Sequence, residues 1–153
     1  MNASMVMDPN PSVLLKDEKI SIGVKLIMEH RYRNIPVVDD KGCYLGMFGV
    51  NCLLRLVLPR AVVVDGGLTT VPFVSDTLRD LRYRLKSVEE EAVTYCMTEK
   101  EVTPVAPDTP LVETLLVLYK TRSSVPVVDP DSGRLVGMIS YWDVGEKILE
   151  QDI

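Results

Sequence analysis

An internal repeat constrains this chain more than any other feature of its sequence. Three stretches recur about ninety positions later: residues 20–30 at 111–121, residues 35–39 at 125–129, and residues 46–48 at 137–139. The clearest match pairs Ile35-Pro36-Val37-Val38-Asp39 with Val125-Pro126-Val127-Val128-Asp129. A repeated unit of this kind is one supersecondary structure that stacks on its own copy. The two halves should therefore fold alike and pack together.

Each copy predicts the same order of elements. Apolar residues at helical spacing are followed by Val-rich runs bounded by Asp and Gly. The first copy predicts an extended piece over 13–15, a helix over 20–30, strands over 35–38 and 43–48, and a helix from about Asn51. The second predicts the same elements over 102–105, 111–121, 125–128 and 135–140, and from about Tyr141. Asp17 and Thr109 are predicted N-caps, with Pro110 at the first helical position.

One such motif is too small to bury both faces of its sheet, so two must pack together. The sequence predicts an α+β fold in which two β-α-β-β-α motifs, related by a pseudo-twofold axis, pack sheet against sheet. The predicted boundaries are 1–58 for the first motif, 59–98 for a connector and 99–153 for the second motif. Within the connector, residues 75–86 predict a helix with Leu78, Leu81 and Leu85 on one face.

Composition and charge exclude several classes of protein. Hydrophobic residues at 46% and charged residues at 25% are typical of a folded chain, and the net charge of −5 disfavours nucleic-acid binding. Three cysteines with one histidine fit neither a disulfide framework nor a zinc site. No signal peptide is evident, and the longest apolar run, Leu115 to Tyr119, is too short to span a membrane. We therefore expect a cytoplasmic protein without a bound metal, and the start at Met1 favours an independent chain.

The two copies differ where the final helix begins. The second copy has Ser140 and Asp143 three residues apart, and the first has Gly49 and Cys52 in their places. One interpretation is a capping box, in which the Ser140 hydroxyl and the Asp143 carboxylate satisfy backbone N–H groups of the first turn. The other is a nucleotide site, since a helix N-terminus with a Ser hydroxyl attracts phosphate and an ionised Asp accepts hydrogen bonds from ribose hydroxyls. The spacing alone leaves both open.

Three runs of the second copy match a known pattern in combination: 102–111 (VTPVAPDTPL), 125–129 (VPVVD) and 137–144 (GMISYWDV). Together they resemble a cystathionine-β-synthase (CBS) domain, and two copies in tandem resemble a CBS pair, or Bateman module. Residues 93–98 (VTYCMT) are similar to the lead-in of such a motif. CBS pairs commonly hold adenosine derivatives in clefts between the motifs. The resemblance therefore implies a regulatory protein in which Asp143 binds a ribose.

We expect one nucleotide site, in the cleft of the second motif. Its candidate residues are Thr103, Val105, Thr109, Arg122, Ser124, Val125, Pro126, Ser140 and Asp143. Val105, Val125 and Pro126 would form apolar walls for the base. Thr103 and Thr109 offer hydroxyl groups, with core packing and capping as their other interpretation. The phosphate would meet Arg122, the basic residues of 30–33 or the connector helix, although such residues also suit a solvated surface.

The first copy is expected to have a degenerate site, or one that binds differently. A neutral thiol is a weak acceptor, so Cys52 cannot replace a carboxylate toward two hydroxyls. Ser12, Val13 and Leu14 would line what remains of this site. The run from Cys52 to Leu58 is apolar except for one arginine, which predicts a helix buried on all sides by the connector or a second subunit. We therefore expect a homodimer that forms mainly through the first copy.

Two functions remain open on the sequence. The first is a non-catalytic sensor that binds AMP, ADP or ATP, with S-adenosylmethionine and NAD ranked behind them, and that signals to an unidentified protein partner. The second is a ligand-free module for dimerisation or protein interaction. Catalysis is disfavoured because the sequence has no Walker loop, no dinucleotide glycine motif, no metal-ligand cluster and no evident nucleophile. No cofactor is expected beyond an adenosine-containing ligand.

Overall fold

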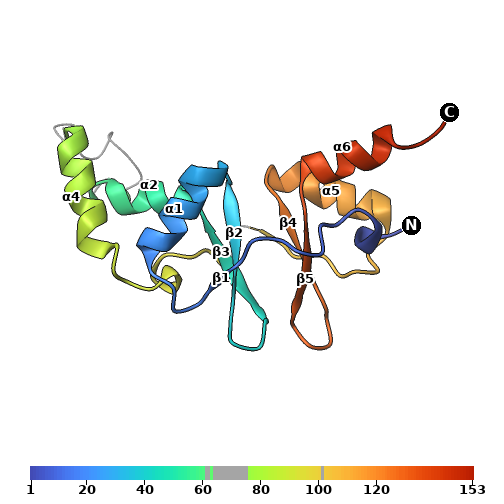
Figure 1. Ribbon diagram of the computed structural model, residues 1–153, viewed down its shortest axis with the longest axis horizontal. Coiled ribbons are helices and arrows are strands. Elements are labelled where there is room, and N and C mark those ends of the chain that lie inside the picture. Colours follow the sequence, from blue (N-terminus) through green and yellow to red (C-terminus); the bar gives the residue numbers. More distant parts are fainter. Residues whose placement is uncertain (61–62, 64–75, 101) are drawn as a thin grey trace.

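The computed structural model describes residues 1–60, 63, 76–100 and 102–153, and it contains two motifs of like build (Figure 1). The first motif consists of β1 (Leu14–Leu15), α1 (Ile20–His30), β2 (Asn34–Val38), β3 (Tyr44–Gly49) and α2 (Val50–Val57). The second consists of α5 (Leu111–Thr121), β4 (Val125–Val128), β5 (Leu135–Ile139) and α6 (Tyr141–Leu149). Three further elements are helix α4 (Leu78–Val88) and the 3-10 turns η1 (Ala3–Met5) and η2 (Val93–Tyr95). The predicted α+β fold is confirmed.

Each motif is built on an antiparallel hairpin. Strand β1 joins β2 in parallel through Leu14 and Val37, and β2 pairs with β3 in antiparallel register. In the second motif β4 pairs with β5, and an isolated parallel bridge between Val105 and Val127 takes the place of β1. The register shifts at the same point of both hairpins, after positions 37 and 127. The repeat is thus preserved even in this irregularity.

An aspartate organises the turn of each hairpin. Asp39 Oδ1 accepts hydrogen bonds from the backbone N–H groups of Lys41 and Cys43, both at 2.9 Å. Asp129 Oδ1 accepts one from the N–H of Asp131, also at 2.9 Å. Hydrogen bonds to a carboxylate favour its charged form. They hold the pKa of Asp39 and the pKa of Asp129 below the usual value, chiefly through Cys43 and Asp131.

The two hairpins pack against each other in the middle of the molecule, with the helices outside (Figure 1). The Tyr44 N–H donates to the Gly133 carbonyl, and the Leu135 N–H donates to the Gly42 carbonyl, both at 2.9 Å. The two hydrogen bonds join equivalent positions of the repeat, as pseudo-twofold symmetry requires. The apolar layer between the hairpins is filled by Met47, Val102 and Met138. The prediction that the motifs pack sheet against sheet is confirmed.

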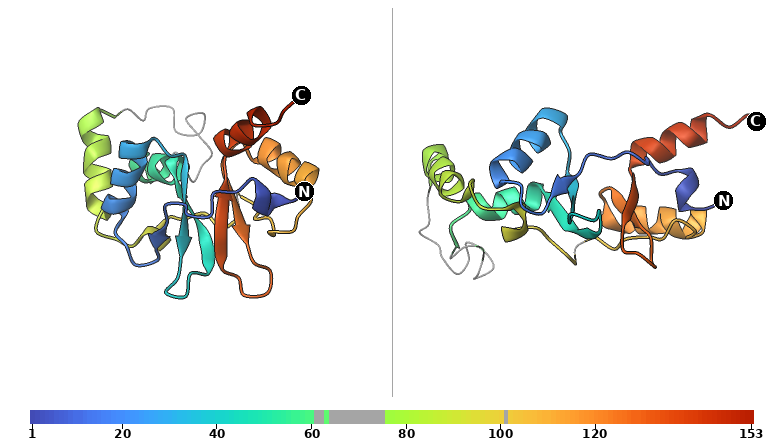
Figure 2. Two further views of the ribbon diagram at one scale, coloured as in Figure 1. Left: turned by 45° about the vertical axis from the view of Figure 1, so that its right-hand side comes forward. Right: turned by 60° about the horizontal axis from the view of Figure 1, so that its bottom comes forward.

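The segment before each motif packs on the other motif. Asp8 exchanges two backbone hydrogen bonds with Met138 of β5, at 2.7 and 3.0 Å, and Ala3 is buried in the second core. In the same way Thr98 exchanges two with Met47 of β3, both at 2.8 Å. The chain therefore starts beside the second motif and crosses to the first, as the views in Figures 1 and 2 show. This exchange ties the two motifs into one unit.

Two equivalent glycines permit this exchange. A Cβ atom at Gly46 would lie 2.6 Å from the Thr98 carbonyl oxygen, and one at Gly137 would lie 2.8 Å from the Asp8 carbonyl oxygen. Both separations are shorter than van der Waals contact allows. A side chain at either position would push the crossing segment off its strand.

Helix α4 covers one side of the first motif. Leu85 and Val88 pack with Leu56 of α2 against the first core. The predicted apolar face of this helix is therefore right for Leu85 but wrong for Leu78, whose side chain is 84% exposed. Ser75, at the start of the predicted helix, lies outside the described residues.

Within one chain, α4 does not bury α2 on all sides. Cys52 is only 1% exposed, but Leu54 on the same helix and Leu58, the residue that follows it, are 54% and 40% exposed. The predicted burial of this helix on every side is therefore wrong for the single chain. The exposed leucines lie on the side of α2 that faces away from the core.

The two predicted N-caps are wrong. Helix α5 begins at Leu111 with Pro110 as its N-cap. The Thr109 hydroxyl instead accepts a hydrogen bond from the Ala106 N–H at 3.0 Å, within the turn before the helix. Asp17 lies three residues before α1 and does not cap it. The helix starts one residue later than predicted, so the Thr109 hydroxyl lies in the turn before α5 and no side chain caps the helix.

Candidate functional site

Ser140 and Asp143 form a capping box at the start of α6. The Ser140 backbone N–H and its hydroxyl both donate to Asp143 Oδ2 at 2.8 Å, and the Asp143 N–H donates to Ser140 Oγ at 3.2 Å. The capping interpretation is thus confirmed. Among the residues that the structure describes, Asp143 Oδ1 has no hydrogen bond, so one oxygen of a fixed carboxylate remains available.

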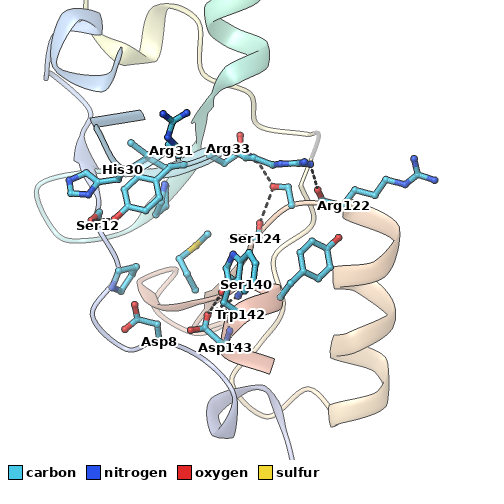
Figure 3. A pocket seen from close by; sticks show the side chains of 18 residues that line it. Asp8, Ser12, His30, Arg31, Arg33, Arg122, Ser124, Ser140, Trp142 and Asp143 are labelled. Carbon is cyan, nitrogen blue, oxygen red and sulfur yellow. Dashed lines mark hydrogen bonds between the residues drawn. The ribbon is translucent and has the colours of Figure 1, made fainter. Parts of the chain in front are cut away.

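A cavity of about 600 Å³, called here the larger cavity, opens beside this helix start (Figure 3). Ser140, Trp142 and Asp143 line it from the second motif, and Ile35 and Pro36 of β2 line it from the first. The site is therefore composite: a helix start from one motif faces a strand from the other. This pairing follows from the pseudo-twofold packing of the two hairpins.

Four basic residues line the larger cavity at the end away from Asp143: His30, Arg31, Arg33 and Arg122 (Figure 3). Arg33 Nη1 donates to the backbone carbonyl of Arg122 at 3.2 Å. Within the described ranges, none of the three arginines is in an ion pair. Asp8 lies at the opposite end, on the same side as Asp143. The cavity is acidic at one end and basic at the other.

Aromatic rings add flat apolar surface to the same cavity. His30 and Tyr32 stack with ring centroids 5.1 Å apart, and the Tyr32 hydroxyl is hydrogen bonded to Ser12 at 3.1 Å. Trp142, the single tryptophan of the chain, lines the cavity from the second motif and is 80% exposed. An exposed tryptophan in a lined cavity is a direct optical reporter of binding.

The structure brings together only part of the predicted site. Arg122, Ser124, Ser140 and Asp143 line the larger cavity, whereas Thr103, Val105, Thr109, Val125 and Pro126 do not. The equivalent residues of the first copy line the cavity instead: Ser12 in place of Thr103, Ile35 in place of Val125, and Pro36 in place of Pro126. Val105 and Val125 are buried in the second core, and Thr109 belongs to the turn before α5. The wall of the predicted cleft thus comes from the other copy.

Several lining residues were missed from the sequence. Asp8, Ile35, Pro36 and Trp142 line the larger cavity, and Ser12 was assigned to the first-copy site. The repeat alignment marks the strand residues as equivalents of predicted ones, so a signal existed. It does not say which strand faces which helix, because that depends on packing.

The start of α2 is the counterpart of the start of α6, and it is built differently. Gly49 replaces the serine, and the Asn34 side chain occupies the space beside it. The Asn34 amide donates to the Ser123 hydroxyl. Cys52 points into the core, where its Sγ donates to the Cys96 carbonyl at 2.9 Å. Neither group of the second-copy pair has an equivalent here.

A cavity of about 270 Å³, called here the smaller cavity, lies at this helix start. It is lined by Arg33, Asn34, Asn51, Arg122 and Ser123, among others. Of the three residues expected in the first-copy site, none lines it: Ser12 lines the larger cavity, Leu14 is fully buried, and Val13 lines neither.

Two further functions, metal binding and membrane crossing, find no support in the part of the chain that the structure describes. No group of three or more His, Cys, Asp and Glu side chains there could hold a metal ion. Of the helices described, none combines the length and the apolar character that crossing a membrane requires.

The fold and cavity define a protein of two like α+β motifs with a composite site between them. The family profile of the CBS domain matches residues 3–59 and 91–150. The chain belongs to the CBS domain family and carries two such domains in tandem. A curated relative, the uncharacterized protein MJ1426 of Methanocaldococcus jannaschii, is 22% identical over 151 residues, which cover 91% of this chain and 86% of that protein.

Solved structures share the whole fold. Protein MJ1004 of M. jannaschii has a TM-score of 0.69 at 21% identity over 98% of this chain, which spans 60% of that one. CBSX2 of Arabidopsis thaliana in complex with AMP has a TM-score of 0.68 at 22% sequence identity, and the match covers 97% of this chain and 96% of that one. The CBS domain pair of protein MJ0100, in complex with 5′-methylthioadenosine and S-adenosyl-L-methionine, has a TM-score of 0.61 at 17% sequence identity. The match covers 97% of this chain and 99% of that one. Likeness at these identities shows the fold alone.

Proposed function

We propose that this protein is a non-catalytic, cytoplasmic regulator that binds an adenosine nucleotide in the larger cavity. One observation carries the proposal. The Asp143 carboxylate is held in place through Oδ2 by Ser140 and leaves Oδ1 toward a cavity of about 600 Å³ between the motifs. Such a volume lies within the range of small-molecule sites. Binding would change the shape of the module only if the ligand prefers one of its conformations.

The chemistry along the cavity matches the parts of a nucleotide. Ribose hydroxyls donate hydrogen bonds, which suits the free oxygen of Asp143. Ile35, Pro36 and Tyr32 offer apolar surface to a base. The basic end suits phosphate, and it lies at the far end from Asp143. The AMP, methylthioadenosine and S-adenosylmethionine complexes of the two CBS structures above support an adenosine-containing ligand.

The first test is a thermal-shift screen with AMP, ADP, ATP, S-adenosylmethionine and NAD. A ligand at 100 times its Kd stabilises the folded chain by about 2.7 kcal/mol, which is readily measured. We expect the melting temperature to rise with at least one adenosine nucleotide. A flat panel would favour the ligand-free function instead.

The second test separates ribose binding from helix capping. Asp143→Ala should weaken nucleotide affinity by roughly ten- to a hundredfold, since a hydrogen bond to a charged group contributes about 1.5–3 kcal/mol. The control is Asp80→Ala in α4, because Thr77 and Asp80 form the same capping box with contacts of 2.8, 2.9 and 3.2 Å. The control variant removes the carboxylate of an equivalent capping box that lies outside the cavity. Equal affinities in both variants would refute the ribose assignment.

A second candidate function is protein interaction, including a homodimer. Large apolar side chains are exposed on the helices of the second motif: Val112, Tyr119, Ile148 and Leu149. In the first motif α4 covers part of the equivalent surface, so the most exposed of these apolar side chains lie on the second motif, whereas the expected dimer contact lies mainly on the first copy. Sedimentation at micromolar concentration tests the dimer, and a monomer would rule out the homodimer but not interaction with a different protein.

A further inference from the structure

We propose that Cys52 and Cys96 form an oxidation site, at which a small hydroperoxide converts the two thiols into a disulfide within the chain. The disulfide would join the start of α2 to the segment that leads into the second motif. Disulfides of cytosolic proteins are usually transient and sense the redox state, so the modification would be reversible. The proposal does not depend on the nucleotide site.

The two cysteines meet in the fold although they lie 44 positions apart in the sequence. Cys52 is in the first turn of α2, and Cys96 follows the 3-10 turn η2. The Cys52 thiol donates a hydrogen bond to the Cys96 carbonyl at 2.9 Å, and the Cys96 side chain packs against the core that contains Cys52. The two thiols are hydrogen-bonding neighbours as well. The S–S bond would therefore form between side chains that already touch.

An arginine lies beside this thiol pair. Arg55 Nη2 donates to the Cys96 carbonyl at 3.1 Å and to Cys52 Sγ at 3.5 Å. A hydrogen bond from the Cys96 thiol, together with the Arg55 guanidinium, lowers the pKa of Cys52 to about 6. The same contact between the thiols raises the pKa of Cys96. Cys52 is therefore the thiolate of the pair and Cys96 remains the thiol.

Ionisation would also reorient Cys52. In the state described here its thiol is protonated and donates to the Cys96 carbonyl. A thiolate has no proton to donate, so the carbonyl oxygen would repel it. Its sulfur would turn toward the two donors beside it, the Cys96 thiol and the Arg55 guanidinium. Loss of the proton thus brings the two sulfur atoms together.

The reaction needs one hydroperoxide for each disulfide. The Cys52 thiolate attacks an oxygen of the peroxide, the O–O bond breaks, and the leaving oxygen takes up a proton to give water or an alcohol. Cys52 is then a sulfenic acid. The Cys96 sulfur attacks the Cys52 sulfur, the S–O bond breaks, and the hydroxyl group leaves as water with the Cys96 proton. Two electrons pass from the two sulfur atoms to the peroxide.

Burial restricts which oxidant can react. Cys52 is only 1% exposed, whereas Cys96 is half-buried and Arg55 is exposed. Movement of these two neighbours can admit a molecule as small as hydrogen peroxide, but not a bulky disulfide such as glutathione disulfide. The site should therefore distinguish oxidants by size.

The second copy of the repeat does not have this pair. Asp143 stands where Cys52 does, and the register of the crossing segments places Val6 where Cys96 stands. Val6 is buried in the second core. Both thiols thus occur together in the first copy, and both are absent from the second. The first copy carries the oxidation site at the helix start where the second carries its capping box.

The disulfide would enclose residues 53–95, which include α4. A disulfide stabilises a fold mainly by constraining the unfolded chain, and more so for a longer loop. It would also fix the segment that pairs with β3 through Thr98 and Met47. The oxidised chain should therefore unfold at a higher temperature than the reduced chain.

Oxidation of the reduced full chain with hydrogen peroxide tests the proposal. Alkylation under denaturing conditions followed by peptide mass mapping should show two of the three thiols lost, a disulfide between Cys52 and Cys96, and its reversal by dithiothreitol. Cys43→Ser is the matched control, since Cys43 Sγ also donates to a backbone carbonyl, that of Ser132 at 3.5 Å. This variant should form the same disulfide. Glutathione disulfide at equal concentration should react at least tenfold more slowly.

Cys96→Ser separates the two steps. It changes a half-buried residue and should leave a sulfenic acid on Cys52 that dimedone traps. The rate of peroxide consumption by the wild type should be about tenfold higher at pH 7 than at pH 5, because the pKa of Cys52 is about 6. An ordinary thiol with a pKa of about 8.5 would give a ratio of about a hundred. The groups that influence Cys52 in this range are Cys96 and Arg55.

The melting temperature gives a further readout. The oxidised wild type should melt about 5 °C or more above the reduced wild type, whereas oxidised and reduced Cys96→Ser should differ by less. Retention of all three thiols, a disulfide that includes Cys43, or a lower melting temperature after oxidation would overturn the proposal. So would a hundredfold ratio between the rates at pH 7 and pH 5. The mapping of the wild type decides the question even where a variant does not fold.

Discussion

The starts of α2 and α6 are the same position of one repeat, and they face different surroundings. Both N-cap residues have extended backbone, with φ −148° and ψ −173° at Gly49 and φ −111° and ψ 167° at Ser140. Asp143 lines a cavity, whereas Cys52 in the matching place is buried in the core. Equal backbone conformation therefore does not imply equal function. The side chains around each helix start decide whether it faces a ligand or the core.

A size exchange accompanies this difference. The first copy pairs Asn34 with Gly49, and the second pairs Ser124 with Ser140 in the equivalent places. In the first copy a large side chain, Asn34, lies beside a glycine at the helix start. In the second copy a small side chain, serine, stands at both positions. Asn34 thus fills the space that a serine side chain takes in the other copy.

The largest effect is expected from making the first copy acidic like the second. Cys52→Asp puts a carboxylate at a site 1% exposed, 2.9 Å from the Cys96 carbonyl oxygen. Burying a charge beside an acceptor should lower the free energy of unfolding by about 3 kcal/mol or more, although the nearby Arg55 guanidinium offsets part of this. Urea denaturation measures it. Cys52→Ser, which keeps the hydrogen-bond donor, should cost much less; equal losses would contradict the charge argument.

A smaller loss is expected from restoring the serine. In Gly49→Ser the new Cβ would overlap the Asn34 side-chain oxygen and lie 2.5 Å from the Arg33 carbonyl oxygen. Overpacking of this kind costs about 1–3 kcal/mol. Adding Asn34→Ser, which reproduces the second-copy pair, should recover part of the loss in a urea titration. No recovery would mean that the backbone contact with Arg33 dominates.

The capping boxes should give a smaller and equal effect. Ser140→Ala in α6 and Thr77→Ala in α4 each remove an N-cap hydroxyl of nearly identical geometry. Loss of such a cap costs about 1 kcal/mol. Thermal unfolding of the two variants should therefore give similar shifts without ligand. A much larger loss at Ser140 would show that its role in the fold extends beyond the helix.

The smallest effect concerns the hairpin turns, where the copies are alike. The pKa of Asp39 and the pKa of Asp129 are lower in the folded chain than in the unfolded chain. Each carboxylate therefore stabilises the fold at pH values above its pKa in the unfolded chain. This contribution is lost as the pH falls through its pKa in the folded chain. Asp39→Asn and Asp129→Asn should each bring the melting temperature of the variant closer to that of the wild type at pH 3 than at pH 7. Unequal pH dependence would show that the copies differ in their turns too.

The sequence alone determined the repeat, the order of elements and the capping box at Ser140, because these depend on local spacing and on bonds within one turn. The two predicted caps were wrong for different reasons. Asp17 lies three residues before α1, too far to cap it. Thr109 bonds within the turn that precedes α5, and Pro110 takes the N-cap position instead. What only the tertiary structure decided is which strand faces which helix start. Ser12, Ile35 and Pro36 stand where their second-copy equivalents were expected, because the sheets pack about a pseudo-twofold axis and bring each helix start to the other copy.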